Sequence, residues 1–95
     1  MKEVNMTTTI DIVAKELHMK PDELLHESLK SYLEKRLSRV EANVFLLTKK
    51  YGVKDVFEMD AKAKEGLISE KDSYDDYFTF DNLEAEREKI KRILE

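Results

Sequence analysis

The chain has 95 residues, which is the size of one small domain. Charged residues make up 40% of it, with both signs intermixed and a formal net charge of −4, so nucleic acid is not expected as the main partner of the whole chain. The absence of Cys excludes disulfides, Cys-ligated zinc and thiol catalysis, and the presence of only two Gly and one Pro favours helices over sheets rich in turns.

Residues 1–21 are predicted to form one short element followed by a turn. In one interpretation the element is a helix, whose inner face would be Ile10, Val13, Ala14 and Leu17. In the other it is a short strand, because the residues between Met6 and Ile12 alternate in polarity. We favour the helix, since the residues after Ile12 are helix formers. Pro21 then suits the first position of the next helix.

Residues 22–52 are predicted to form one long helix with an apolar seam along its length. The seam residues follow one another at steps of three and four: Leu33, Leu37, Val40, Val44, Leu47 and Tyr51. Such a helix would be about 45 Å long, which is longer than a compact domain of this size is wide. Its seam therefore needs another helix of this chain or a second copy of the chain, and a homo-oligomer or a hetero-complex is expected.

Residues 53–68 are predicted to form a bridging helix, with Asp55 as its N-cap and Gly66 at its end. Residues 69–95 are predicted to contain an acidic and aromatic segment, Ser69 to Asp81, and then a terminal helix that Asp81 begins. The terminal helix is expected to fold back antiparallel against the long one. The predicted fold is thus all-α and coiled-coil-like, with one structural domain overall.

No arrangement of residues points to catalysis, a cofactor or a metal. His18 and His26 lack the four-residue spacing with a flanking Glu that a zinc-binding helix requires. The adjacent carboxylates of Asp75 and Asp76 would diverge by about 100° around a helix axis. We therefore expect a protein that is not an enzyme and that binds no metal and no cofactor.

Two regions are candidates for binding a macromolecule. The long helix carries a basic cluster that could contact DNA: Lys30, Lys35, Arg36 and Arg39. The segment from Ser69 to Asp81 has five carboxylates against one lysine and four of the eight aromatic residues. It is either a loop that covers the core or a surface that docks on a basic protein. The candidate contacts in the second interpretation are Tyr74, Asp75, Asp76, Tyr77, Phe78 and Phe80.

The layout of the chain resembles the small prokaryotic antitoxins of type II toxin-antitoxin modules. The resemblance rests on IDIVAKELHMKPDELLHESLKSYLEKRL, which is similar to a helix-turn-helix or ribbon-helix-helix portion, on the helix end KKYGV, and on the acidic, aromatic tail. It implies that the tail neutralises a basic toxin encoded next door and that the front half acts as a DNA-binding repressor. A self-associating coiled-coil subunit is a further alternative. No apolar run approaches the ~18 residues of a membrane span, so a cytosolic protein is expected.

Overall fold

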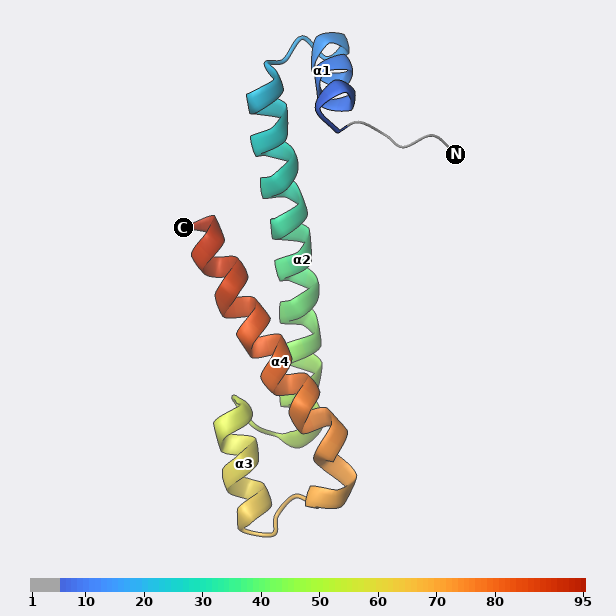
Figure 1. The fold of residues 1–95 in the computed structure, drawn as a ribbon. Helices are drawn as coiled ribbons and strands as arrows, with labels where there is room; N and C mark the ends of the chain where they lie inside the picture. Colours follow the sequence, from blue (N-terminus) through green and yellow to red (C-terminus); the bar gives the residue numbers. More distant parts are fainter. Residues whose placement is uncertain (1–5) are drawn as a thin grey trace, which may run out of the picture. The chain divides into compact units, whose positions relative to one another are not determined.

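The computed structural model describes residues 6–95, with side chains described from Thr9 onward. The described residues form four α-helices: α1 (Met6–Glu16), α2 (Pro21–Tyr51), α3 (Val56–Lys64) and α4 (Glu70–Leu94) (Figure 1). The predicted all-α class is confirmed, including the short first helix, the long second helix and the terminal helix that returns along it. The strand interpretation of Met6 to Ile12 is wrong, because these residues lie within α1.

The chain divides into two compact units. Unit 1 is Met1–Glu34 and holds α1 and the first part of α2. Unit 2 is Lys35–Glu95 and holds the second part of α2 together with α3 and α4. The length of the chain predicts one structural domain overall, and α2 belongs to both units.

Unit 1 contains the predicted turn after its first helix, but without the glycine that usually follows a helix. α1 ends at Glu16, and His18 in the turn after it has a φ of 57°, in the left-handed region that glycine normally occupies. The Met19 N–H donates to the Ala14 carbonyl at 2.8 Å, and the His18 N–H donates to the Lys15 carbonyl at 3.2 Å. The predicted inner face of α1 is only partly correct. Ala14 is buried, whereas Val13 and Leu17 are exposed.

Unit 2 has a hydrophobic core that all three of its helices build. Its buried apolar residues are Val40, Val44, Val53, Val56, Met59, Phe80 and Ile90. α4 returns alongside the second part of α2, and α3 packs against α4 (Figure 1). Of the predicted seam, Val40 and Val44 are buried, while Leu33, Leu37, Leu47 and Tyr51 are half-buried.

The turns on either side of α3 follow the predicted chemistry. Gly52 and Gly66 have φ values of 63° and 79°, so each supplies the left-handed residue after a helix. Val53, directly after Gly52, is buried and closes the end of α2. Asp55 is the N-cap of α3, and its Oδ1 accepts the Glu58 N–H at 2.8 Å.

The acidic, aromatic segment is a helix and not a loop. α4 begins at Glu70, and Ser69 is its N-cap through a 3.3 Å hydrogen bond that its Oγ accepts from the Asp72 N–H. The helix continues past Asp81, so the predicted start at Asp81 is wrong. The reason is that Ser69 supplies a cap twelve residues earlier, and no residue after it breaks the helix.

Candidate protein-binding surface

A surface groove of about 180 Å³ lies between α3 and the first turns of α4, within unit 2. Its lining residues are Met59, Asp60, Ala63, Glu70, Ser73, Tyr74, Tyr77 and Phe78. The α3 residues recur at helical spacing because one face of that short helix is turned toward α4. All five of the α4 residues come from the segment Ser69 to Asp81 that sequence analysis singles out, so this segment forms one wall of the groove.

Two aromatic side chains stand exposed at the wall of this groove. Tyr74 and Phe78 are 62% and 48% exposed, and their ring centroids lie 4.9 Å apart in an edge-to-face arrangement. Tyr77 is half-buried, and its ring meets that of Phe78 at 5.7 Å. Residues four apart on a helix share a face, so Tyr74 and Phe78 present one continuous apolar surface to solvent. Large aromatic surfaces of this kind are typical of protein interfaces.

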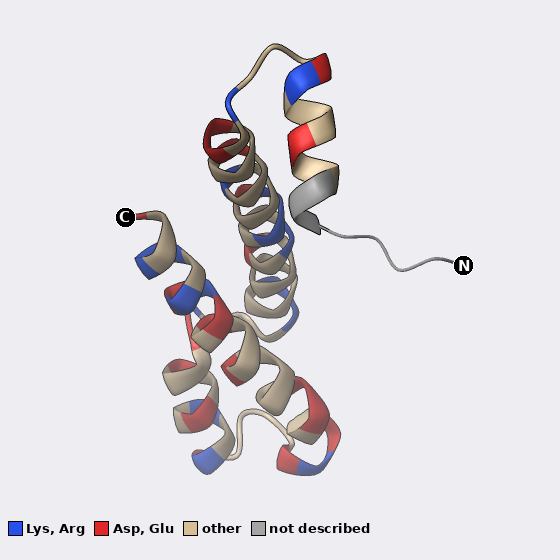
Figure 2. Cartoon of the chain, turned by 45° about the horizontal axis from the view of Figure 1, so that its top comes forward, with Lys and Arg blue, Asp and Glu red and all other residues tan. Residues whose placement is uncertain are grey.

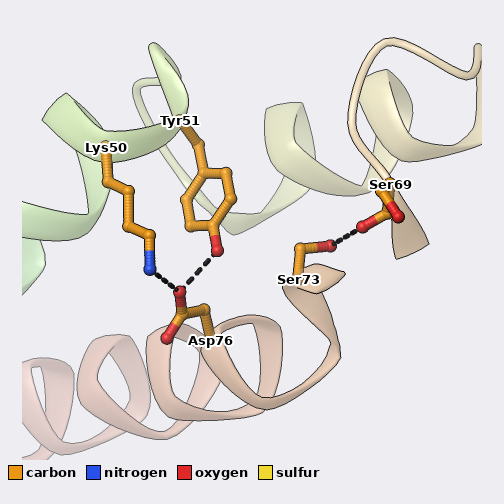
Figure 3. A network of polar contacts seen from close by, with 5 residues as sticks. All are labelled: Lys50, Tyr51, Ser69, Ser73 and Asp76. Carbon is orange, nitrogen blue, oxygen red and sulfur yellow. Dashed lines mark hydrogen bonds and ion pairs between the residues drawn. The ribbon is translucent and has the colours of Figure 1, made fainter. Parts of the chain in front are cut away.

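The carboxylate of Asp76 is held inside the unit. The Lys50 Nζ approaches its Oδ2 at 2.6 Å, and the Tyr51 hydroxyl donates to the same oxygen (Figure 3). The hydrogen bonds from Lys50 and Tyr51 hold the pKa of Asp76 below its ordinary value, and Asp76 in turn raises the pKa of Lys50. Burial raises the pKa of Tyr51. Asp76 therefore fastens α4 to the end of α2.

The first turn of α4 is fixed by a second polar contact. The buried Ser73 hydroxyl donates to the Ser69 carbonyl at 2.7 Å (Figure 3). This bond satisfies a buried hydroxyl group within the same turn. Together with the Ser69 cap, it fixes the first turn of α4, which contributes Glu70 and Ser73 to the groove lining.

Two of the predicted contact residues, Phe80 and Asp76, are not available for contact, and Asp76 is the one already paired with Lys50 and Tyr51. Phe80 has no exposed surface (0%), so it belongs to the core and not to a contact surface. Asp75 is exposed, on the turn next to the paired Asp76. The seam position of Phe80, three residues before Leu83, is the sequence signal for burial. The residues available for contact are therefore Tyr74, Asp75, Phe78 and part of Tyr77.

Acidic side chains accompany the aromatic ones. Figure 2 shows Asp and Glu concentrated over the first turns of α4. Glu70 is exposed at the groove. The other groove carboxylate, Asp60, pairs with Lys64 at 3.0 Å, and this contact raises the pKa of Lys64. The groove thus combines an apolar wall with carboxylates at its edge.

The predicted DNA-contact residues are divided between the two units. Lys30 is an exposed residue of unit 1, and Lys35 and Arg39 are exposed residues of unit 2. Arg36 forms a two-pronged ion pair with Glu86 of α4, at 2.5 Å from Nε to Oε1 and 3.0 Å from the second guanidinium nitrogen to Oε2. This pairing holds the pKa of Glu86 below its ordinary value. Arg36 therefore helps to join α2 to α4.

Comparison with known proteins places the chain in a family. All of it, residues 1–95, matches the model described as the Uncharacterized protein MJ0235 family. The chain belongs to this family. No curated protein and no solved structure matches it. The family match indicates no toxin-antitoxin function, so the antitoxin resemblance stays a prediction.

The described residues offer few other sites. Between residues 6 and 95, no group of three or more His, Asp or Glu side chains is placed to hold a metal ion. None of the helices in that range combines the length and apolarity needed to cross a membrane. A second hollow, beside Phe45, Gly52 and Glu58, is larger, at about 510 Å³, but it is more open to solvent and more polar. The groove between α3 and α4 is therefore the candidate site that we develop.

Proposed function

We propose that this protein is a non-catalytic binding module that neutralises a basic partner protein, as the antitoxins it resembles do. The observation that carries the proposal is the exposed pair Tyr74 and Phe78 at the wall of the acidic groove. Buried aromatic residues dominate the energetics of many protein interfaces. Leaving two of them in water is unfavourable unless a partner covers them.

The size of the groove favours a protein partner over a small molecule. Clefts that hold drug-sized ligands have volumes of roughly 300–1,000 Å³. The groove, at about 180 Å³, is smaller, and it is open to solvent. It suits one large side chain of a partner, with the exposed rings packing around it.

The charge around the groove favours a basic partner. The segment from Ser69 to Asp81 has five carboxylates and one lysine. Of these carboxylates, Asp76 is neutralised within the unit, whereas Glu70 and Asp75 are exposed. Exposed carboxylates next to an apolar surface attract and orient partners that carry Lys and Arg. A toxin whose active site holds RNA or nucleotide phosphate would present such a basic surface.

The proposal is tested by co-expressing the tagged chain with the product of the adjacent reading frame. We expect the two proteins to purify together, and the double substitution Tyr74→Ser and Phe78→Ser to weaken binding at least ~30-fold, since two interface aromatics are lost. Phe57→Ser is the matched control, because Phe57 is 80% exposed on α3 and does not line the groove. Failure to co-purify, or equal loss with the control, would contradict the proposal.

DNA binding by the front half is the alternative, and the structure gives it less support. Glu86 offsets the charge of Arg36, one of the four basic residues concerned. The alternative requires a salt-dependent gel shift with the chain's own upstream DNA. That shift should disappear when the charges of Lys35, Arg36 and Arg39 are removed together.

A further inference from the structure

Unit 1 exposes apolar side chains on both of its helices. Among its side chains from Thr9 to Glu34, six large apolar ones are exposed: Ile12, Val13, Leu17, Leu25, Leu29 and Tyr32. Among its described side chains, from Thr9 to Glu34, only that of Ala14 is buried. Unit 2 buries seven apolar residues in a core. Unit 1 therefore has the apolar residues of a core, but they face solvent.

The exposed residues of α2 lie on one face of the helix. Leu25, Leu29 and Tyr32 follow one another at steps of four and three, which is the spacing of a packed helix face. Further along α2, the same seam contains Val40 and Val44, which are buried in unit 2. The seam is therefore covered at its end in unit 2 and uncovered at its start in unit 1.

Unit 1 lacks the usual means by which a very small unit is stabilised. An isolated helix of 11 residues, the length of α1, is marginal in water. Folded units below about 40 residues usually depend on disulfides, on a metal or on oligomerisation. The chain has no Cys, and the described residues include no group placed to hold a metal. Association is the means that remains.

We propose that a second copy of this chain covers the apolar face of unit 1, so that two copies of α1 and of the start of α2 form a dimer interface. Because this face must be covered for α1 to be stable, its partner has to be present whenever the chain is made, and a second copy always is. Two-fold dimers, in which the same surface of each copy meets, are the commonest assemblies.

The available surface is large enough for such a dimer. On α1, Val13 and Leu17 lie about 40° apart around the helix axis, whereas Ile12 lies about 100° from Val13 and is left out of the interface. Five apolar side chains that each bury roughly 100 Å² give about 500 Å² per chain and about 1,000 Å² in all, which reaches the lower limit of specific interfaces. An interface of this small size is typical of a reversible dimer and not of an obligate one. The interface is separate from the groove in unit 2, and its test needs no other protein.

The test is the mass of the full chain in solution, measured by sedimentation equilibrium from low micromolar to near-millimolar concentration. We expect the mass to rise toward twice that of one chain. Leu25→Glu and Leu29→Glu should each weaken the dimer about 100-fold, because a carboxylate would be buried without a partner. Leu46→Glu is the matched control, since Leu46 is also an exposed leucine of α2 but belongs to unit 2.

Amide hydrogen exchange of the same samples provides a second measurement. The amides of α1 should be protected at high concentration and lose that protection in Leu29→Glu but not in Leu46→Glu. A wild-type chain that stays monomeric throughout, whether or not α1 is protected, would overturn the proposal. So would a dimer that Leu46→Glu disrupts as strongly as Leu29→Glu does, because the interface would then lie in unit 2.

Discussion

At the residue scale, His18 has the least favourable backbone conformation outside glycine. It is the one non-glycine residue between 6 and 95 with a positive φ. A side chain in this region costs on the order of 1 kcal/mol, because Cβ approaches the following carbonyl oxygen. His18→Gly should therefore slow hydrogen exchange in α1 by up to about fivefold, as glycine is the preferred residue after a helix.

The control for His18→Gly is a substitution of the opposite kind, glycine to a residue with a Cβ, at Gly52. Gly52 has the same left-handed conformation, and a Cβ at this position would meet no atom within 4 Å. Gly52→Ala should therefore lower the free energy of unfolding of unit 2 by about 1 kcal/mol through conformation alone. If His18→Gly speeds exchange in α1, the imidazole makes a favourable contact that outweighs the strain.

Glu84 is a second residue whose surroundings oppose its charge. Burial raises the pKa of Glu84 above its ordinary value, the Val56 N–H and the charge of Arg87 act in the opposite direction, and Oε1 has no hydrogen-bond partner. The native state therefore binds this proton more tightly than the unfolded chain does. The contribution of Glu84 to the free energy of unfolding is therefore greatest at low pH, where its carboxyl is protonated. This contribution is lost as the pH rises through the raised pKa.

Replacing Glu84 by Gln removes this charge while keeping an acceptor for the Val56 N–H. We expect the Tm of Glu84→Gln to exceed that of the wild type by roughly 2–4 °C at neutral pH. The difference should shrink below about pH 4, where the wild-type carboxyl is protonated in both states. Glu88→Gln, on the exposed side of the same helix, is the control. A lower Tm for Glu84→Gln at neutral pH would show that its negative charge stabilises the fold.

At the scale of elements, the sequence predicts a helix end wherever the capping residue acts locally. Asp55 and the two glycines are such residues, because a cap depends only on its neighbours within one turn. The start of α4 could be predicted by the same rule, since Ser69 is followed by an acidic residue three positions later. A loop that covers the core is one of the two interpretations of this segment, yet the segment is helical, Asp76 bonds to the end of α2 and Phe80 is buried.

The cap of α3 gives a prediction about a single element. Asp55→Ala should lower the free energy of unfolding of unit 2 by about 1 kcal/mol, because the Glu58 N–H loses its partner. Asp55→Asn keeps an acceptor oxygen and removes the same charge, so it should stay within a few tenths of a kcal/mol of the wild type. Urea unfolding of both variants measures the difference. If both variants lose the same free energy of unfolding, the loss is due to the removed charge and not to the missing cap.

At the scale of the whole molecule, the sequence predicts which faces need cover but not what covers them. Helical spacing marks the seam from Leu25 to Tyr51 as one apolar face. It does not show that α4 covers the seam only in unit 2, because that depends on where the turns direct the chain. The position of the groove could not be predicted from the sequence either, because it also depends on where the turns direct the chain. Its aromatic wall is visible in the sequence, whereas its other wall comes from α3.

The two units should differ in stability, and hydrogen exchange measures this within one molecule. Unit 2 has a seven-residue apolar core, whereas only Ala14 is buried among the described side chains of unit 1. Protection should therefore be higher around Val44 than around Leu25, although both lie in α2. Phe80→Leu should lower protection in unit 2 by roughly 1–2 kcal/mol, since its ring is completely buried.

The two units should also differ in how their amide protection depends on protein concentration. Protection around Leu25 should increase with protein concentration, because a second copy supplies the cover in unit 1, whereas protection around Val44 should stay constant because α4 supplies it. Phe80→Leu should leave the concentration dependence in unit 1 unchanged. If protection rises in both units together, the seam is covered by a second copy along its whole length, and the fold-back of α4 is not what stabilises unit 2.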